Sequence, residues 1–134
     1  MFKLIKIQNS GVNVPEPIII KKLSETEIKS GEALTLEYGY LTSCIPTQKP
    51  LYVAINNAKY DDEYAVVFEV NSNMLFETTI NGDPSELFVG DKVTMANDEN
   101  GSAVMVSSNT TSGVATIVDL MDAEKIGDKI TVKF

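Results

Sequence analysis

Two stretches decide the fold: YAVVFEV at residues 64–70 and LFETTI at residues 75–80. Both are dense in β-branched and aromatic side chains, which favour extended strands. Working outward in both directions, further short runs of the same character are separated by turn residues. They occupy residues 1–7, 18–20, 34–38, 51–55, 92–95, 103–107, 114–118 and 129–134. The sequence therefore predicts an all-β protein, either a small β-barrel or a β-sandwich.

Helix signals are few. Ser24 followed by Glu27 matches a capping box, and residues 121–125 could form a single helical turn. Neither signal precedes a long apolar stripe, so we expect a low helix content. Asn100 and Gly101 favour the positive φ angles of a hairpin turn, which predicts a hairpin with residues 97–101 at its tip.

One short unit occurs three times. Each copy has a glycine, an acid, a free position, an apolar residue, a threonine and a second apolar residue. The copies are Gly31-Glu32-Ala33-Leu34-Thr35-Leu36, Gly90-Asp91-Lys92-Val93-Thr94-Met95 and Gly127-Asp128-Lys129-Ile130-Thr131-Val132. Glycine supplies a turn conformation, the acid accepts a backbone hydrogen bond, and the apolar-Thr-apolar run begins a strand. We interpret the unit as a strand start, with a ligand-binding loop rim as the alternative.

The N-terminal region differs from the rest because it contains Pro15 and Pro17. These prolines remove two backbone donors and argue against a central strand. We expect a turn at residues 9–13 and an extended N-terminal arm over residues 1–27, followed by a β body over residues 28–134. Deleting residues 1–17 is then expected to weaken attachment to a partner more than it destabilises the body.

Composition excludes several functions. The 134 residues include 11 Lys plus Arg and 19 Asp plus Glu, for a net charge of −8, and no His. An acidic surface repels phosphate, so we expect neither a nucleic-acid partner nor an anionic membrane partner. Without His, the Ser-His-Asp and Cys-His arrangements of nucleophilic catalysis are impossible. No Gly-rich phosphate-binding motif is present.

The candidate site residues all have simpler structural interpretations. The acidic clusters at residues 61–63 and 97–100 offer oxygen ligands, but each has too few for calcium and reads as a solvated loop. Cys44 has no His to act as its base and reads as a small buried thiol. We therefore assign no catalytic, cofactor-binding or metal-binding residue and expect no cofactor.

Two further alternatives stay open. The five tyrosines could line a carbohydrate platform, although on strands such side chains more often cover core edges; they are Tyr38, Tyr40, Tyr52, Tyr60 and Tyr64. A pair of carboxylates could also perform glycoside hydrolysis if the two faced each other across a cleft. We expect a protein that is not an enzyme.

Targeting signals are also absent from the sequence. The longest apolar run near the N-terminus is too short for a signal-peptide core, and no run approaches the length of a membrane helix. The single cysteine cannot form a disulfide within the chain. We expect a chain that is made and used as a soluble protein.

The order of several motifs resembles that of the capsid decoration or stabilisation proteins of tailed-phage heads and of related small prophage structural proteins. The motifs that carry this resemblance are residues 29–34, 38–41, 49–54, 89–93, 112–117 and 127–132. The resemblance runs from about residue 29 to residue 134, and the proline-bearing segment is similar to the arms that such proteins lay along their neighbours.

The resemblance implies a non-enzymatic virion structural protein of a phage or prophage. Such a protein binds the major capsid protein lattice on the capsid surface and is made in the cytoplasm of the bacterial host. It also implies a homo-oligomer, with a trimer as one option. An alternative of another class is a carbohydrate- or receptor-binding β module of a phage tail or bacterial surface.

Overall fold

The computed structural model describes residues 1–8 and 14–134. These residues form twelve strands and no helix, which confirms the all-β prediction. The strands are β1 (Lys3–Ile7), β2 (Ile18–Lys21), β3 (Ala33–Glu37), β4 (Tyr40–Ser43), β5 (Tyr52–Ala54), β6 (Tyr64–Glu69), β7 (Met74–Asn81), β8 (Lys92–Val93), β9 (Met95–Asn97), β10 (Ala103–Ser107), β11 (Ala115–Asp119) and β12 (Lys129–Lys133). No described segment forms an apolar helix long enough to cross a bilayer.

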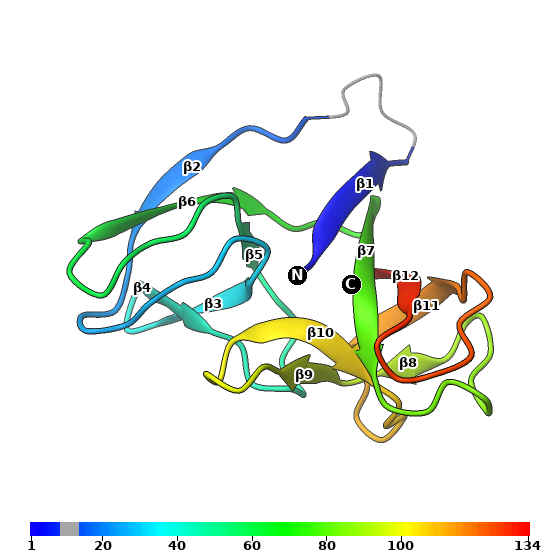
Figure 1. Ribbon diagram of the computed structural model, residues 1–134. Helices are drawn as coiled ribbons and strands as arrows, with labels where there is room; N and C mark the ends of the chain where they lie inside the picture. The colour runs from blue at the N-terminus through cyan, green and yellow to red at the C-terminus, as the bar shows by residue number, and fades with distance from the viewer. Residues whose placement is uncertain (9–13) are drawn as a thin grey trace.

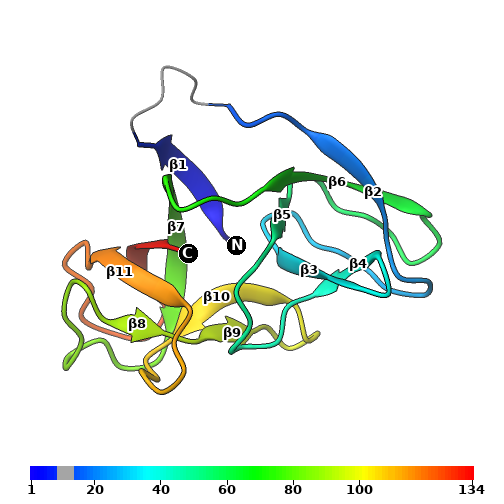
Figure 2. The ribbon, with the colours of Figure 1, turned by 180° about the vertical axis from the view of Figure 1, so that it is seen from behind.

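The strands form two sheets. One has seven strands in the order β8-β11-β12-β7-β10-β9, with β1 added to β7. The other has five strands in the order β2-β6-β5-β3-β4. Figures 1 and 2 show the two sheets side by side, with the chain crossing from one to the other between β6 and β7. This arrangement fits the sandwich-like prediction, whereas a closed barrel is not confirmed.

Strand β7 organises the larger sheet. It pairs antiparallel with β1 on one side and with β12 on the other, so that Leu4 and Val132 both lie opposite Phe76. Its last residues pair in parallel with β10, where Ile80 lies opposite Val106. The first and last strands of the chain therefore flank the same strand, and the two termini lie close together in Figure 1.

An aromatic cluster joins the sheets. Phe2, Phe76 and Phe134 pack at 5.2–6.5 Å between ring centroids. Phe68 of β6 stacks on Phe76 of β7 at 6.1 Å, with an interplanar angle of 5°. Because β6 and β7 belong to different sheets, this pair connects the five-stranded sheet to the main core. A smaller core lies within the five-stranded sheet around Leu34, Leu41 and Val67.

The N-terminal segment is part of both sheets. Strand β1 pairs with β7, Phe2 is only 2% exposed, and β2 pairs with β6 at the edge of the smaller sheet. The extended arm is therefore not confirmed. The turn expected at residues 9–13 lies outside the described residues, and the division into residues 1–27 and 28–134 stays a prediction. An edge position for β2 agrees with the expectation from Pro15 and Pro17 that this segment avoids the sheet centre.

Most predicted strands are confirmed, with two differences. The run at residues 92–95 divides at Thr94, since β8 pairs with β11 and β9 pairs with β10. Strand β4 was not expected. The hairpin between β9 and β10 is confirmed, with Gly101 at a φ of 81° in its turn. The two single-turn helix signals form turns and not helices.

The three repeated units adopt the same turn. Each glycine has a positive φ and donates its N–H to a carbonyl of a neighbouring strand at 2.8 Å. The carboxylate accepts the N–H of the residue three positions earlier. These bonds are Lys29 to Glu32 at 2.7 Å, Phe88 to Asp91 at 2.9 Å and Lys125 to Asp128 at 3.1 Å. The structure thus confirms the interpretation of the unit as a strand start.

Substitution of these glycines by Ala is expected to separate backbone strain from crowding. Gly90 and Gly127 have no heavy atom within 4 Å of an added Cβ, so their variants carry only the strain of positive φ, about 1 kcal/mol. At Gly31 the added Cβ would lie 2.5 Å from Met1 Cβ and 3.1 Å from Phe2 N. We expect Gly31→Ala to cost a further 1–3 kcal/mol or so. Urea unfolding of the three variants measures the difference, and equal losses would contradict this packing.

Candidate functional site

A polar pocket of about 350 Å³ lies where the five-stranded sheet meets the β9–β10 hairpin. Its walls come from the segment before β3, from β4 and from the hairpin turn. The lining residues that matter chemically are Lys29, Glu32, Ser43, Asn100 and Ser102. The pocket therefore gathers polar groups from three segments that are distant in the sequence.

An ion pair spans the edge of this pocket. Lys29 Nζ lies 2.5 Å from Asp98 Oδ2. Asp98 Oδ1 also accepts the backbone N–H groups of Asn100 and Ser102, at 2.9 and 3.0 Å. The hydrogen bond from Lys29 is the main reason that the pKa of Asp98 lies below its usual value. This pair connects the segment before β3 to the hairpin of the other sheet.

Glu32 is the buried acid of the pocket. Glu32 is 1% exposed, and its Oε2 accepts the backbone N–H of Lys29 at 2.7 Å. A hydrogen bond with the Ser43 side chain favours the charged form, but desolvation outweighs it and raises the pKa of Glu32 above its usual value. The Ser43 hydroxyl also accepts the Ala103 N–H at 3.2 Å. The acid thus supports the contact between β4 and β10.

The chemistry available in this pocket is limited. Lys29 and Asp98 neutralise each other, and the turn backbone and Ser43 occupy the Glu32 carboxylate. Ser43 hydrogen-bonds with Glu32 and also accepts the Ala103 N–H, so its hydroxyl is held in the contact between β4 and β10. The arrangement can join the two sheets and hold a small polar molecule.

Replacing Glu32 by Gln is expected to raise stability at neutral pH. A carboxyl group whose pKa is raised on folding stabilises the folded state at low pH, and this stability is lost as the pH rises through the raised pKa. The amide keeps an acceptor for Lys29 N–H and carries no charge. The thermal midpoint of Glu32→Gln should exceed that of the wild type at pH 7, and the gain should shrink towards pH 4.

The exposed Glu86→Gln variant is the matched control, with no gain in thermal midpoint expected. If Glu32→Gln lowers the midpoint equally at both pH values, the account of a desolvated carboxylate is wrong.

The two predicted acidic clusters serve as turns. Asp62 accepts the Lys59 N–H at 2.8 Å, and Glu63 forms an ion pair with Lys21 at 3.2 Å. Asp98 of the other cluster belongs to the polar pocket. The described residues contain no group of three or more acidic or Cys side chains placed to hold a metal.

Cys44 is buried in the main core. Desolvation, with a smaller contribution from the charge of Glu32, raises the pKa of its thiol to about 12. Since the thiolate is the nucleophile, Cys44 is unreactive at neutral pH.

The tyrosines do not form one platform. Tyr38 is 91% exposed at the β3–β4 turn, and Tyr52 is half-buried. Tyr40 and Tyr64 lie on either side of Lys21, whose Nζ is 5.7 Å from the centre of the Tyr40 ring and which pairs in register with Tyr64. This small group of two exposed rings and one ammonium is the part of the predicted carbohydrate platform that the structure brings together.

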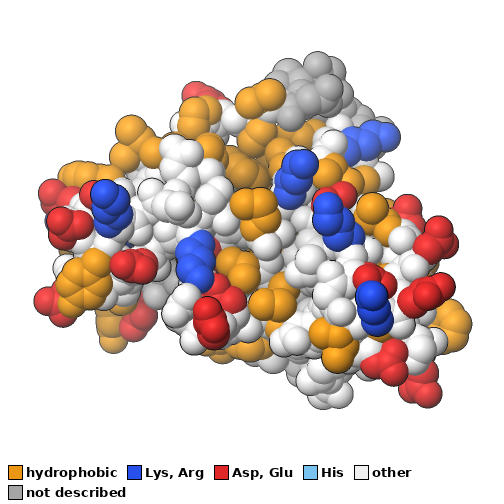
Figure 3. All heavy atoms as spheres, viewed as in Figure 1, with side chains coloured by type: hydrophobic (Ala, Val, Ile, Leu, Met, Phe, Trp, Pro, Cys, Tyr) orange, Lys and Arg blue, Asp and Glu red, His pale blue; other side chains and the backbone are white. Residues whose placement is uncertain are grey.

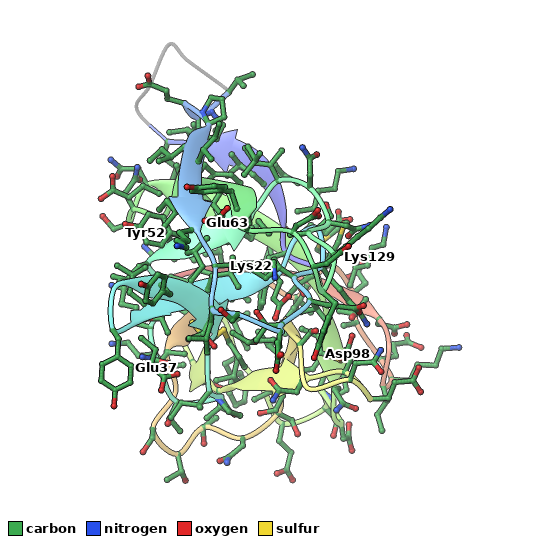
Figure 4. The ribbon with its side chains drawn as sticks, turned by 90° about the vertical axis from the view of Figure 1, so that its left-hand side faces the viewer. Lys22, Glu37, Tyr52, Glu63, Asp98 and Lys129 are labelled. Carbon is green, nitrogen blue, oxygen red and sulfur yellow. The ribbon has the colours of Figure 1, made fainter. Side chains whose placement is uncertain are left out.

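Sequence reasoning missed the buried charge of Lys22. It is 2% exposed, and its Nζ donates to the carbonyl oxygens of Thr26 at 2.6 Å and Tyr60 at 3.2 Å. Figure 4 shows Lys22 within the part of the fold built from the five-stranded sheet. The sequence around Lys21 and Lys22 shows only two adjacent lysines after an apolar run, which is typical of an edge strand.

Comparison with known proteins indicates the class of fold. No family model matches the sequence, and no curated protein sequence is detectably similar. Among solved structures, the fold is similar to that of the N base of the head fibre gp8.5 of bacteriophage phi29. The TM-score is 0.50 and the identity 13%, and the match covers 89% of this chain and 94% of that chain. The chain therefore shares the overall β fold of a phage head fibre base over nearly its whole length.

Proposed function

We propose that this chain is a non-enzymatic structural protein of a phage or prophage virion. In this proposal it decorates and stabilises the capsid by binding the lattice of the major capsid protein. The observation that carries it is the similarity of fold to a head fibre base, which covers 89% of this chain and 94% of the other. The motif order that resembles capsid decoration proteins supports the same class.

The chemistry of the described residues is consistent with a structural role that needs no catalytic turnover. The acidic clusters form turns, the thiol of Cys44 is buried, and the pocket carboxylate Glu32 is held by the backbone and a serine. A shell-bound protein instead needs a stable fold and exposed contact surface. Many weak contacts to one lattice can then give firm attachment, because binding is repeated across the shell.

The segment that leads into β2 is the proposed contact with the lattice. Val14, four residues before β2, is 74% exposed, and Ile19 on this edge strand is 70% exposed. The far side of this segment is bridged to β4 at Lys22 and Leu41, which leaves residues 18–20 to pair with a strand of a partner. Exposed apolar side chains add to such pairing. The proposed site is the capsid surface of the virion, and the protein would be made in the bacterial host cytoplasm.

Sedimentation with capsids tests this proposal. Purified protein is mixed with mature heads from the phage whose genome encodes it, and the bound fraction is measured after centrifugation. We expect binding that saturates at a fixed ratio to the major capsid protein, with none to heads of an unrelated phage. Absence of sedimentation with the cognate heads would refute the proposal.

Val14→Ser combined with Ile19→Ser is expected to weaken this binding at least tenfold. Both side chains are exposed, so the free energy of unfolding should change by no more than about 0.5 kcal/mol. Ile45→Ser, at a residue that is 61% exposed away from β2, is the control. Equal binding by all three proteins would place the contact elsewhere on the chain and contradict a role for this edge. Deletion of residues 1–17 is unsuitable here, because it removes the buried Phe2.

A carbohydrate- or receptor-binding module is the second candidate. It is favoured by the exposed Tyr40 and Tyr64 beside Lys21, since aromatic faces can stack on sugar rings. A glycan array with and without calcium distinguishes the candidates. A specific glycan signal that Tyr64→Ala abolishes, without binding to heads, would favour this second function.

A further inference from the structure

The apolar tips of two repeated turns project from one end of the larger sheet. Phe88 and Val89 stand at the Gly90 turn, and Ile126 stands at the Gly127 turn, with exposed fractions of 71%, 63% and 64%. The start of the first loop lies beside the second, since Asp83 lines a pocket of about 410 Å³ together with Glu124, Lys125 and Ile126. We call Phe88, Val89 and Ile126 the turn tips.

Carboxylates surround the turn tips. Asp83, Glu86, Asp122 and Glu124 are exposed on the same two loops, which also carry Lys125 and are followed by the exposed Lys92 and Lys129. Figure 3 shows Asp and Glu side chains gathered at this end of the molecule, on the right of the view. The turns are also rigid, because each is held by its glycine N–H and by its acid.

Exposed apolar side chains among carboxylates are complementary to a surface that combines exposed apolar side chains with lysine or arginine.

The same chain carries a surface of that kind on strand β1. Lys3 and Lys6 are exposed on β1, and Met1 and Ile5 beside them are 55% and 46% exposed. Within the described residues, neither lysine takes part in an ion pair. We call Met1, Lys3, Ile5 and Lys6 the lysine edge. Figure 3 shows lysine side chains over the β1 region, away from the acidic end.

Within one chain the turn tips and the lysine edge both stay exposed. Lys6 pairs with Leu75 near the beginning of β7, whereas the loop that carries the first turn tip leaves β7 after Asn81. Leu75 and Asn81 are six residues apart on β7, a span of roughly 20 Å at about 3.3 Å per residue. Met1 and Lys3 lie nearer to the Gly127 turn, because they line a pocket with Thr79 and Lys129, yet the turn tips remain exposed in this chain. A lysine edge that covers them would therefore have to come from a second copy.

We propose that copies of this chain associate head to tail, with the turn tips of one copy docked on the lysine edge of the next. The contact joins two different surfaces, so it builds a ring if the rotation closes and an open chain if it does not. Apolar contact supplies affinity, and the opposed charges set the orientation. The inference is independent of capsid attachment, since it concerns contacts between copies of this chain alone.

Sedimentation equilibrium of the full chain at low and high salt is the first test. We expect species larger than the monomer at low salt. The apparent Kd should be higher at high salt, because salt screens the attraction between the carboxylates of one copy and the lysines of the next. A wild-type chain that is monomeric at every concentration would overturn the proposal.

Two variants test the surfaces separately. The tip variant combines Phe88→Ser with Ile126→Ser, and the edge variant combines Lys3→Gln with Lys6→Glu. Each is expected to raise the apparent Kd at least tenfold, whereas the exposed control Lys49→Glu should leave it unchanged. Thermal unfolding shows whether each variant is folded.

A mixture of the two variants gives the sharpest result. The tip variant keeps an intact lysine edge, and the edge variant keeps intact turn tips, so one productive contact is possible. An equimolar mixture should form a dimer containing one copy of each variant and nothing larger. If one variant alone associates like the wild type, or if the mixture stays monomeric, the head-to-tail contact is wrong.

Discussion

Replacing Phe2 by Ala is expected to lower the free energy of unfolding by about 3–5 kcal/mol, which is a large share of the stability of a typical domain. Phe2 is 2% exposed and packs edge-on against Phe76 and Phe134 at centroid distances of 6.5 and 5.2 Å. Its backbone N–H also donates to the Gly31 carbonyl at 2.8 Å. Truncation leaves a cavity where the first strand meets the centre of the core.

Urea unfolding at pH 7 measures this loss. Phe88→Ala is the matched control, because Phe88 is 71% exposed and its truncation should cost no more than about 0.5 kcal/mol. Deleting residues 1–8 should destabilise the protein even more, since it removes β1 as well. A loss below about 1 kcal/mol for Phe2→Ala would show that the N-terminus is not a core element.

Gly113→Ala is the second substitution with a large expected effect, a loss of about 3 kcal/mol from overpacking against backbone. An added Cβ would overlap the Lys92 carbonyl and lie 2.6 Å from Val93 N. Neither group can move freely, because Lys92 and Val93 form β8 and pair with β11. The clash therefore separates two paired strands.

Gly101→Ala is the control for this prediction. Gly101 has a φ of 81° and no heavy atom within 4 Å of an added Cβ, so its variant should lose about 1 kcal/mol from backbone strain alone. Equal thermal midpoints for the two variants would contradict the close approach of Gly113 to β8.

Local pattern was enough to predict most strands, the β9–β10 hairpin and the repeated turns. It was not enough for β4, because the β3–β4 turn uses Tyr38 at a φ of 50° followed by Gly39 at 83°. Two successive positive φ angles are typical of a tight hairpin turn, but Asn or Asp usually takes the first position. The Tyr-Gly pair therefore gave no hairpin signal.

Strand partners are decided by tertiary packing, which local pattern does not encode. Pro15 and Pro17 suggested a loosely packed arm, yet the aromatic Phe2 before β1 is buried in the main core. The two neighbouring runs at residues 64–70 and 75–80 likewise look alike in sequence, but β6 and β7 belong to different sheets. Alternation identifies a strand and its buried face without naming its neighbour.

The polar pocket could be predicted only in fragments. The unit that contains Glu32 was recognised as a turn, and the loop that contains Asp98 was recognised as a hairpin tip. Lys29 and Asp98 are 69 residues apart in sequence, and their ion pair depends on how the two sheets meet. The turn tips were missed because single exposed apolar residues have no periodic signature.

Cryo-electron microscopy of phage heads tests the proposed capsid role most directly. Heads are prepared from particles that carry the gene for this chain and from matched particles in which that gene is deleted. We expect density that fits this two-sheet fold at regular positions on the outer surface of the first heads, and bare positions on the second. Identical head surfaces in the two preparations, or density for this fold on the tail alone, would contradict capsid decoration.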